Sequence, residues 1–230
     1  MSFGLAWAGR TVLRLTIGHD HIFDSFGFMW FAAAPSIGGF VAVFVEDGWN
    51  GLRRFSRRVF NLRFSLWVWG LALLLPLVAG ALTFVGHPGD LLQGGQPKLA
   101  PLLSALTAMN FFTGPLAEEF GWRGYLLNRL GRRMPPWLAG LVMGPIWALW
   151  HVPLFYDSIF AHWQAAPGFF LWLTAWSVVL ALIVARAKGS VLPSIIGHWT
   201  LNNQTAFFAA LFPALPLTIC PAAPLSRLQA

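Results

Sequence analysis

Long apolar segments alternate with short polar ones along this chain. A helix needs about 20 predominantly apolar residues to cross the roughly 30 Å hydrocarbon core of a bilayer. Segments of that length run over residues 27–46, 64–86, 102–128, 137–156, 167–186 and 192–212. The pattern therefore predicts an all-α protein, a polytopic membrane helix bundle of about six transmembrane helices.

The same pattern divides the chain into four parts. Residues 1–26 are predicted to be an N-terminal arm or a partial helix, and residues 27–99 hold two N-terminal transmembrane helices joined by a basic loop. Residues 100–212 form a membrane core that contains most of the polar residues found inside the spans. The tail, 213–230, contains four prolines, and we expect no continuing helix there.

Composition places the whole chain in the membrane rather than in water. Hydrophobic residues make up 57% of the sequence, charged residues only 10%, and the mean hydropathy is +0.64. A soluble domain carries roughly 25% charged residues. We therefore expect an integral membrane protein whose first partner is the lipid bilayer. The single cysteine, Cys220, excludes an intrachain disulfide and a cysteine metal cluster.

The positive charge is concentrated in alternate loops. Five arginines lie between residues 51 and 63, three lie between 129 and 133, and Arg186 and Lys188 follow the fifth span. No basic face with interleaved aromatic residues accompanies the net charge of +7, so we expect no nucleic-acid partner. The positive-inside rule puts these loops in the cytoplasm and both termini outside, as in a bacterial inner (plasma) membrane protein. Arg10 and Arg14 argue against an outside N-terminus. The pattern leaves the oligomeric state open.

Two adjacent acids, Glu118 and Glu119, lie inside the third span. An uncompensated charge at the centre of a bilayer costs about 2.5–3.5 kcal/mol on insertion scales, so intramembrane ionisable residues usually mark a functional site. Glu119 and Arg123 are one helical turn apart with the acid first, which predicts an ion pair. Glu118 lies about 140° from Arg123 around the helix and remains available as a general base. The alternative is a structural ion pair beside an interfacial acid.

Polar groups recur on two later spans. His151 follows Trp147 by one turn on the same helix face, although a lone histidine can also be a hydrogen-bonded core residue. His198 and Asn202, at positions i and i+4, project from one face and can each donate a hydrogen bond to a developing oxyanion. The alternative for this second pair is polar contact between helices. Because polar residues are so rare here, we expect the three spans to converge on one site.

These motifs, in this order, resemble one family. EExxxR at 118–123, a histidine in the next span and HxxxN at 198–202 resemble the CAAX protease and bacteriocin-processing (CPBP, or Abi) family of intramembrane proteases. The resemblance covers about residues 100–212 and implies that this segment is a catalytic core. It implies an endopeptidase for a membrane-associated or lipidated protein or peptide. The family's second motif usually reads FxxxH, whereas here Trp147 and His151 stand at those positions.

The resemblance also implies a role for each polar residue. Glu118 and His151 would position and deprotonate the attacking water, and His198 and Asn202 would bind the oxyanion of the tetrahedral intermediate. The pair formed by Glu119 and Arg123 would fix the helix that carries the base.

The cofactor expected from the resemblance is either none or Zn²⁺. Family members are commonly described as zinc metalloproteases, and Glu118, His151 and His198 could complete a three-ligand catalytic zinc site. A metal-free glutamate mechanism also fits, because Asn202 is a poor zinc ligand and a good oxyanion donor. We favour the metal-free mechanism.

Two other functional classes are compatible with these residues. Buried glutamate and histidine side chains relay protons in ion-coupled transporters, although the chain lacks the repeated halves of many carriers. A non-catalytic bacteriocin-immunity or scaffold membrane protein would retain the motifs without cleaving anything. The sequence fixes neither the substrate nor the cleavage site.

Overall fold

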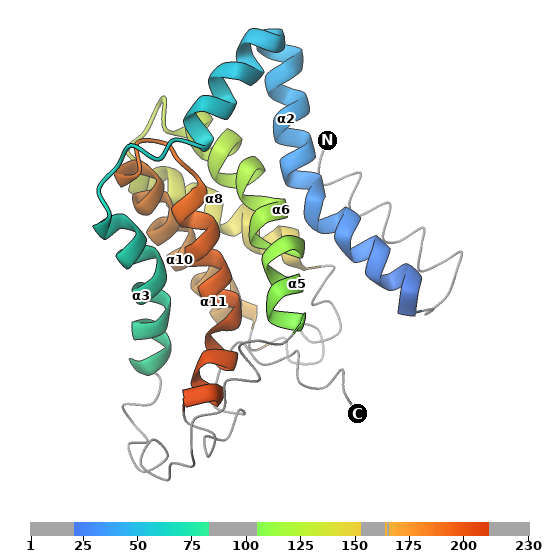
Figure 1. Ribbon diagram of the computed structural model, residues 1–230, viewed down its shortest axis with the longest axis vertical. Coiled ribbons are helices and arrows are strands. Elements are labelled where there is room, and N and C mark those ends of the chain that lie inside the picture. The colour runs from blue at the N-terminus through green and yellow to red at the C-terminus, as the bar shows by residue number, and fades with distance from the viewer. Residues whose placement is uncertain (1–20, 83–104, 153–163, 165, 212–230) are drawn as a thin grey trace.

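A computed structural model describes residues 21–82, 105–152, 164 and 166–211, and in these ranges the protein is helical with no strand (Figure 1). The all-α prediction is therefore confirmed. The elements are α2 His21–Val59, α3 Trp67–Leu82, α5 Ala105–Thr113, α6 Pro115–Glu119, the π-helix η1 Phe120–Leu126, α7 Leu127–Leu130, α8 Pro136–His151, α10 Ala166–Arg186 and α11 Leu192–Leu211.

The helices pack into one bundle around large aromatic side chains. The main contacts are made by α8 with α10, by α11 with α3, and by α2 with α6 and η1. Figure 1 shows α5 and α6 between α2 and α11. Trp147 and Trp150 of α8 are fully buried in the main core, together with Met143 and Leu180.

Glycines allow α8 and α10 to approach closely. A Cβ atom added to Gly140 would lie 2.7 Å from the Cα of Val178, and one added to Gly144 would lie 2.5 Å from the Cα of Thr174. Both atoms belong to the backbone of α10, so no side-chain rotation could relieve the clash. Small residues four apart on α8 therefore set the distance between the two helices.

The predicted loop after the first span is wrong, because most of it is helical. The chain turns at Gly48 (φ 61°, ψ −157°), a left-handed conformation that suits glycine, and α2 continues from there to Val59 as a second arm. Phe55 and Val59, one turn apart on this arm, are buried, whereas Arg53 and Arg57 are exposed. Burial of this apolar stripe explains why the basic segment folds as an amphipathic helix.

The third predicted span is not one regular helix. In its described part it breaks at Gly114, restarts with Pro115 in the first turn of α6, and then widens into η1. Gly121 of η1 lies against α2, and a Cβ atom there would be 2.1 Å from the carbonyl oxygen of Pro35. Irregular turns of this kind are frequent at functional sites.

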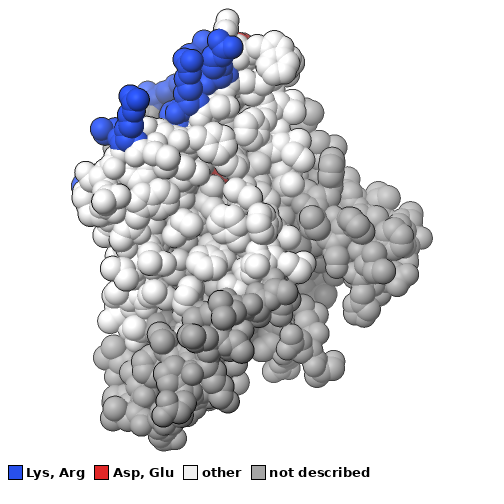
Figure 2. Space-filling view, viewed as in Figure 1, with Lys and Arg blue, Asp and Glu red and all other residues white. Residues whose placement is uncertain are grey.

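The surface and the helix lengths fit a bilayer environment. By length and composition, Phe31–Val59 and Ala166–Arg186 are each able to cross a membrane. Large apolar side chains such as Leu74 and Leu171 are exposed on the bundle. Figure 2 shows lysine and arginine gathered at one end, above a described surface that is almost free of charge. This is the distribution expected for cytoplasmic basic segments.

The predicted terminal parts are only partly visible. Helix α2 begins at His21, so the described residues of the predicted arm 1–26 are helical. Residues 1–20 and the predicted tail 213–230 lie outside the described residues.

Candidate active site

Two tryptophan side chains hold the carboxylate of Glu118. The indole Nε1 of Trp147 donates to Oε2 of Glu118 at 3.0 Å, and the indole of Trp122 donates to the same oxygen at 3.3 Å. Glu118 is only 5% exposed. The indole groups orient the carboxylate and solvate it without adding a positive charge that would pair with it.

Glu119 connects two other residues in the bundle interior. Its Oε1 accepts a hydrogen bond from Nη1 of Arg123 at 2.7 Å and lies 2.9 Å from Nδ1 of His198. A carboxylate only accepts, so Nδ1 of His198 is the donor. All three residues are at most 2% exposed. The ion pair expected from helix geometry is present, and it extends to α11, which the sequence did not predict.

Trp147 is the residue around which the three predicted spans meet. Its ring centroid lies 5.1 Å from that of His198, 5.5 Å from that of His151 and 4.1 Å from Cζ of Arg123. Its indole also contacts Glu118 through the hydrogen bond from Nε1. The acid of the third span and the histidines of the fourth and sixth therefore adjoin one buried side chain.

The tautomer of His151 follows from its backbone contact. Nδ1 lies 2.8 Å from the carbonyl oxygen of Trp147, one turn earlier on α8. A carbonyl accepts, so Nδ1 donates and Nε2 is the acceptor nitrogen when the ring is neutral. In this form Nε2 of the imidazole can orient a water molecule by accepting a hydrogen bond from it.

Asn202 has neighbours different from those of His198. Its side chain is exposed, and its amide donates to Oδ1 of Asn110 at 3.2 Å beside the break at Gly114. Residues four apart share a helix face but lie 5–6 Å apart along it, so the two side chains reach different parts of the bundle. The prediction that His198 and Asn202 face one buried site therefore holds for His198, which is buried, but Asn202 is exposed.

The sequence reasoning missed two hydrogen-bonding partners, the donor Trp122 and the acceptor Asn110. Trp122 follows Glu118 by four residues, a spacing that places its indole next to the acid. The prediction considered only Arg123, the charged residue of this segment. Asn110 lies outside every motif, and only the packing of α5 against α11 brings it to Asn202.

The predicted zinc ligands do not form a metal site in this arrangement. Among the described residues, no three His, Cys, Asp or Glu side chains are grouped closely enough to hold an ion. Oε2 of Glu118 also accepts hydrogen bonds from two indoles. Glu118, His151 and His198 as placed do not fit a three-ligand zinc site, and we derive no chemical step through one.

An apolar helical bundle with carboxylates and imidazoles gathered in its interior is typical of an integral membrane protein, and these polar groups are the candidate functional centre. Residues 100–203 match the family model of the type II CAAX prenyl endopeptidase Rce1-like proteins. The chain is also similar to CAAX prenyl protease 2 of Methanococcus maripaludis, with 30% identity over a match that covers 38% of this chain and 35% of that protein. The chain thus spans about a third of the length of this curated relative.

These comparisons confirm the resemblance predicted from the motifs. Residues 100–203, which contain all six predicted site residues, are similar to the type II CAAX prenyl endopeptidase Rce1-like family.

Proposed function

We propose that this protein is an intramembrane endopeptidase that hydrolyses a peptide bond in a prenylated, membrane-associated protein or peptide. The observation that supports this most directly is the meeting of Glu118, His151 and His198 around Trp147 in a buried part of the bundle. The family match and the name of the relative support the reaction class and the prenylated substrate.

In the proposed mechanism Glu118 is the general base. It accepts a proton from a water molecule as the water oxygen attacks the scissile carbonyl carbon. Nε2 of neutral His151 accepts the second proton of that water in a hydrogen bond and so orients it. When the tetrahedral intermediate collapses, the C–N bond breaks, and the proton held by Glu118 passes to the leaving amine. No metal takes part in these steps.

His198 is the proposed oxyanion donor. Its Nδ1 donates a hydrogen bond to the carboxylate of Glu119, which fixes the ring, and in the proposed reactive form Nε2 also carries a proton and donates it in a hydrogen bond to the oxyanion. Arg123 holds Glu119 in place through the ion pair. We retain Asn202 as a second donor, which would act after its amide leaves Asn110.

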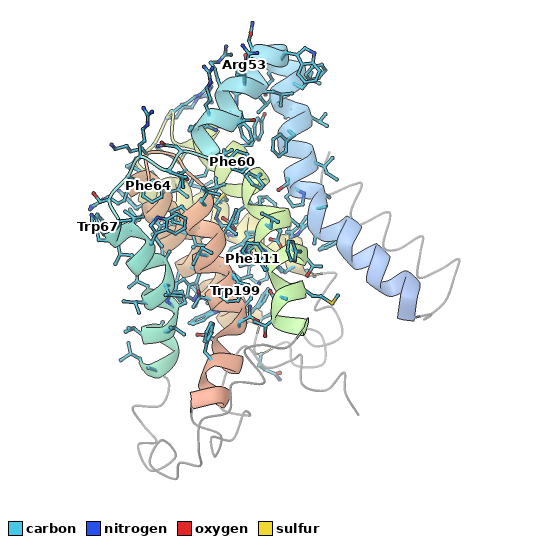
Figure 3. All side chains as sticks on the ribbon, viewed as in Figure 1. Arg53, Phe60, Phe64, Trp67, Phe111 and Trp199 are labelled. Atoms are coloured by element: carbon cyan, nitrogen blue, oxygen red, sulfur yellow. The ribbon has the colours of Figure 1, made fainter. Side chains whose placement is uncertain are left out.

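An apolar groove beside this centre supports a prenylated substrate. A cavity of about 350 Å³ between α5 and α11 is lined by Ala108, Phe111, Phe112, Ile196 and Trp199. Figure 3 shows Phe111 and Trp199 next to each other across these helices. Trp199 directly follows His198, so we propose that an isoprenoid chain lies in this groove while its peptide reaches the buried acids.

The decisive test is the replacement Glu118→Gln, which keeps the size of the side chain but removes the base. We expect cleavage of a prenylated reporter peptide to fall at least about 100-fold, the lower range for loss of a general base. Glu46→Gln is the matched control, because Glu46 lies at the surface with Tyr125 and Arg129 and far along the chain from the site. Near-normal turnover by the Glu118 variant would refute the mechanism.

The alternatives give different results in the same experiment. A transporter would show flux that depends on Glu118 without any peptide cleavage, and a scaffold protein would show neither activity.

Metal removal tests the proposed metal-free step. We expect cleavage by the purified protein to be unchanged after incubation with 1,10-phenanthroline, because Glu118 alone accepts the proton from water. The metal content of the same sample is measured in parallel. Loss of activity that is restored by added Zn²⁺ would contradict this proposal and leave the endopeptidase function intact.

A further inference from the structure

A second cavity lies at the basic end of the bundle, apart from the apolar groove. Its volume is about 310 Å³, and it lies between α7, α8, α10 and the turn that follows α10. Four cationic side chains line it, and none of the lining residues is acidic; the cations are Arg58, Arg123, Arg132 and Lys188. Figure 2 shows the wider gathering of lysine and arginine at this end.

Arg58 is a fixed wall of this cavity. Its Nη1 donates to Oδ1 of Asn128 at 2.8 Å, and its Nη2 donates to the carbonyl oxygen of Gly124 at 2.6 Å. The turn after α10 is shaped around its stem: Gly189 has φ 86°, and a Cβ atom there would be 2.9 Å from Cγ and Cδ of Arg58. The cation is therefore preorganised before any ligand arrives.

Arg123 is the most buried of the four cations that line the cavity. Its guanidinium is 1% exposed and uses Nη1 for the ion pair with Glu119. Its Nε and Nη2 have no hydrogen-bond partner in the described part of the protein. Buried donors of a charged group almost always have hydrogen-bond partners. An acceptor bound in this cavity would supply a partner for these unpaired N–H groups of Arg123.

Arg132 and Lys188 lie exposed where the cavity meets solvent. Neither takes part in a salt bridge with any acid in the described ranges, whereas Arg54 and Arg129 at the same end pair with Asp47 and Glu46. The cavity therefore combines two cations at its mouth with two in its walls; Glu119 pairs with Arg123 from outside the lining, and none of the lining residues is an acid.

We propose that this cavity binds a phosphate group, either the headgroup phosphate of an acidic phospholipid or free phosphate. Guanidinium groups donate parallel hydrogen bonds that match phosphate oxygens. Basic pockets between transmembrane helices at the cytoplasmic side are suited to acidic headgroups, and that position favours the lipid as the source. The two sites share Arg123, but binding of phosphate here does not depend on the proposed proteolysis.

The test uses the full chain purified in neutral detergent. The thermal unfolding midpoint is measured during titration with phosphatidylglycerol, with phosphatidylcholine, and with inorganic phosphate at constant ionic strength. The cavity variants are Arg132→Ala and Lys188→Asn; asparagine is chosen because Lys188 has a left-handed backbone (φ 55°) that asparagine tolerates. The charge-matched control is Arg53→Ala, at a residue that lies near the bend of α2 at the top of Figure 3 and outside the cavity.

We expect phosphatidylglycerol to raise the midpoint and phosphatidylcholine to leave it unchanged. The apparent affinity should fall about fivefold for each cavity charge removed, and Arg53→Ala should leave it unchanged. Stabilisation by inorganic phosphate alone, lost in the cavity variants, would assign the site to free phosphate. Equal stabilisation by both lipids without a phosphate effect, or an equal loss in Arg53→Ala, would overturn the proposal.

Discussion

Trp147 shows how one side chain can alter a site while preserving its pattern of motifs. At the position where the related motif usually has phenylalanine, this chain has a larger ring with a hydrogen-bond donor. The indole faces His151 and His198, lies against Arg123, and donates to Glu118. A phenyl ring could fill much of this space but could not donate to the proposed base.

We therefore predict that Trp147→Phe lowers kcat for the reporter peptide by about tenfold to a hundredfold, the loss expected for one hydrogen bond to a charged group. KM should change little, because the indole contacts the proposed base rather than the substrate groove. Trp122→Phe is the matched comparison: its bond to Glu118 is longer, 3.3 Å against 3.0 Å, so its effect should be smaller. An unchanged kcat in Trp147→Phe would show that this bond does not support catalysis.

At the residue scale, contacts within one helix were predictable and contacts between helices were not. The spacing of Glu119 and Arg123 was sufficient to predict their ion pair. The contact between Glu119 and His198 crosses from α6 to α11, and nothing in the spacing of residues 79 apart specifies it. The same limit applies to the bond between Asn110 and Asn202.

Among the elements, η1 depends on close contact with α2. Gly121 reaches the backbone of Pro35, and Ser36 accepts a hydrogen bond from the backbone N–H of Gly121 through its hydroxyl oxygen at 3.3 Å. The segment that carries Trp122 and Arg123 is therefore positioned by a helix that contributes none of the predicted site residues.

The substitution Gly121→Ala should push η1 away from α2. The added methyl group meets backbone atoms, so we expect a loss of about 1–3 kcal/mol in the free energy of unfolding, as for overpacking in a core. The lowered unfolding midpoint is measured in detergent. Gly70→Ala on α3 is the control: a Cβ atom there has no neighbour within 4 Å, and alanine should stabilise the helix by about 0.5–1 kcal/mol. Equal stability of both variants would contradict the close approach.

Helix boundaries were predictable where the sequence marks them. The prolines at 135 and 136 mark the start of α8, and the glycine at 189 lies between the end of α10 and the start of α11. At Gly48 the prediction failed, because arginines were taken as a loop although Phe55 and Val59 give the segment a buried face. The π-helix has no comparable sequence mark, since it depends on packing against α2.

For the whole molecule, the two cavities lie in different surroundings. The groove between α5 and α11 has only apolar lining residues, whereas the cavity between α7, α8 and α10 has cationic walls. Arg123 reaches both the ion pair of the buried centre and the wall of the basic cavity. A bundle that binds a prenylated substrate in the apolar groove and an acidic headgroup in the basic cavity would interact with both the hydrocarbon chains and the charged headgroups of the membrane.

Narrowing the apolar groove should affect one substrate class only. We predict that Ala108→Trp raises KM for a prenylated peptide by at least about tenfold, because an indole would occupy volume needed by the isoprenoid and remove more than one buried CH₂ contact. KM for the same peptide without the prenyl group should be unchanged. Ala81→Trp, at an exposed position on α3, controls for an added surface indole. An equal rise for both peptides would place the isoprenoid elsewhere.

The π-helix at Phe120–Leu126 also makes the site depend on the exact number of residues in this segment. Its bonds span five residues instead of four, as in the bond from the N–H of Leu127 to the carbonyl of Trp122, so the segment holds one residue more than a regular helix would need. Deleting that residue would let the helix close regularly and rotate everything before it by about 100°. Glu118 and Glu119 would then face away from Trp147 and His198, with every side chain of the centre still present. The phase of this helix, set by a count of residues, is thus as necessary to the site as the acids themselves.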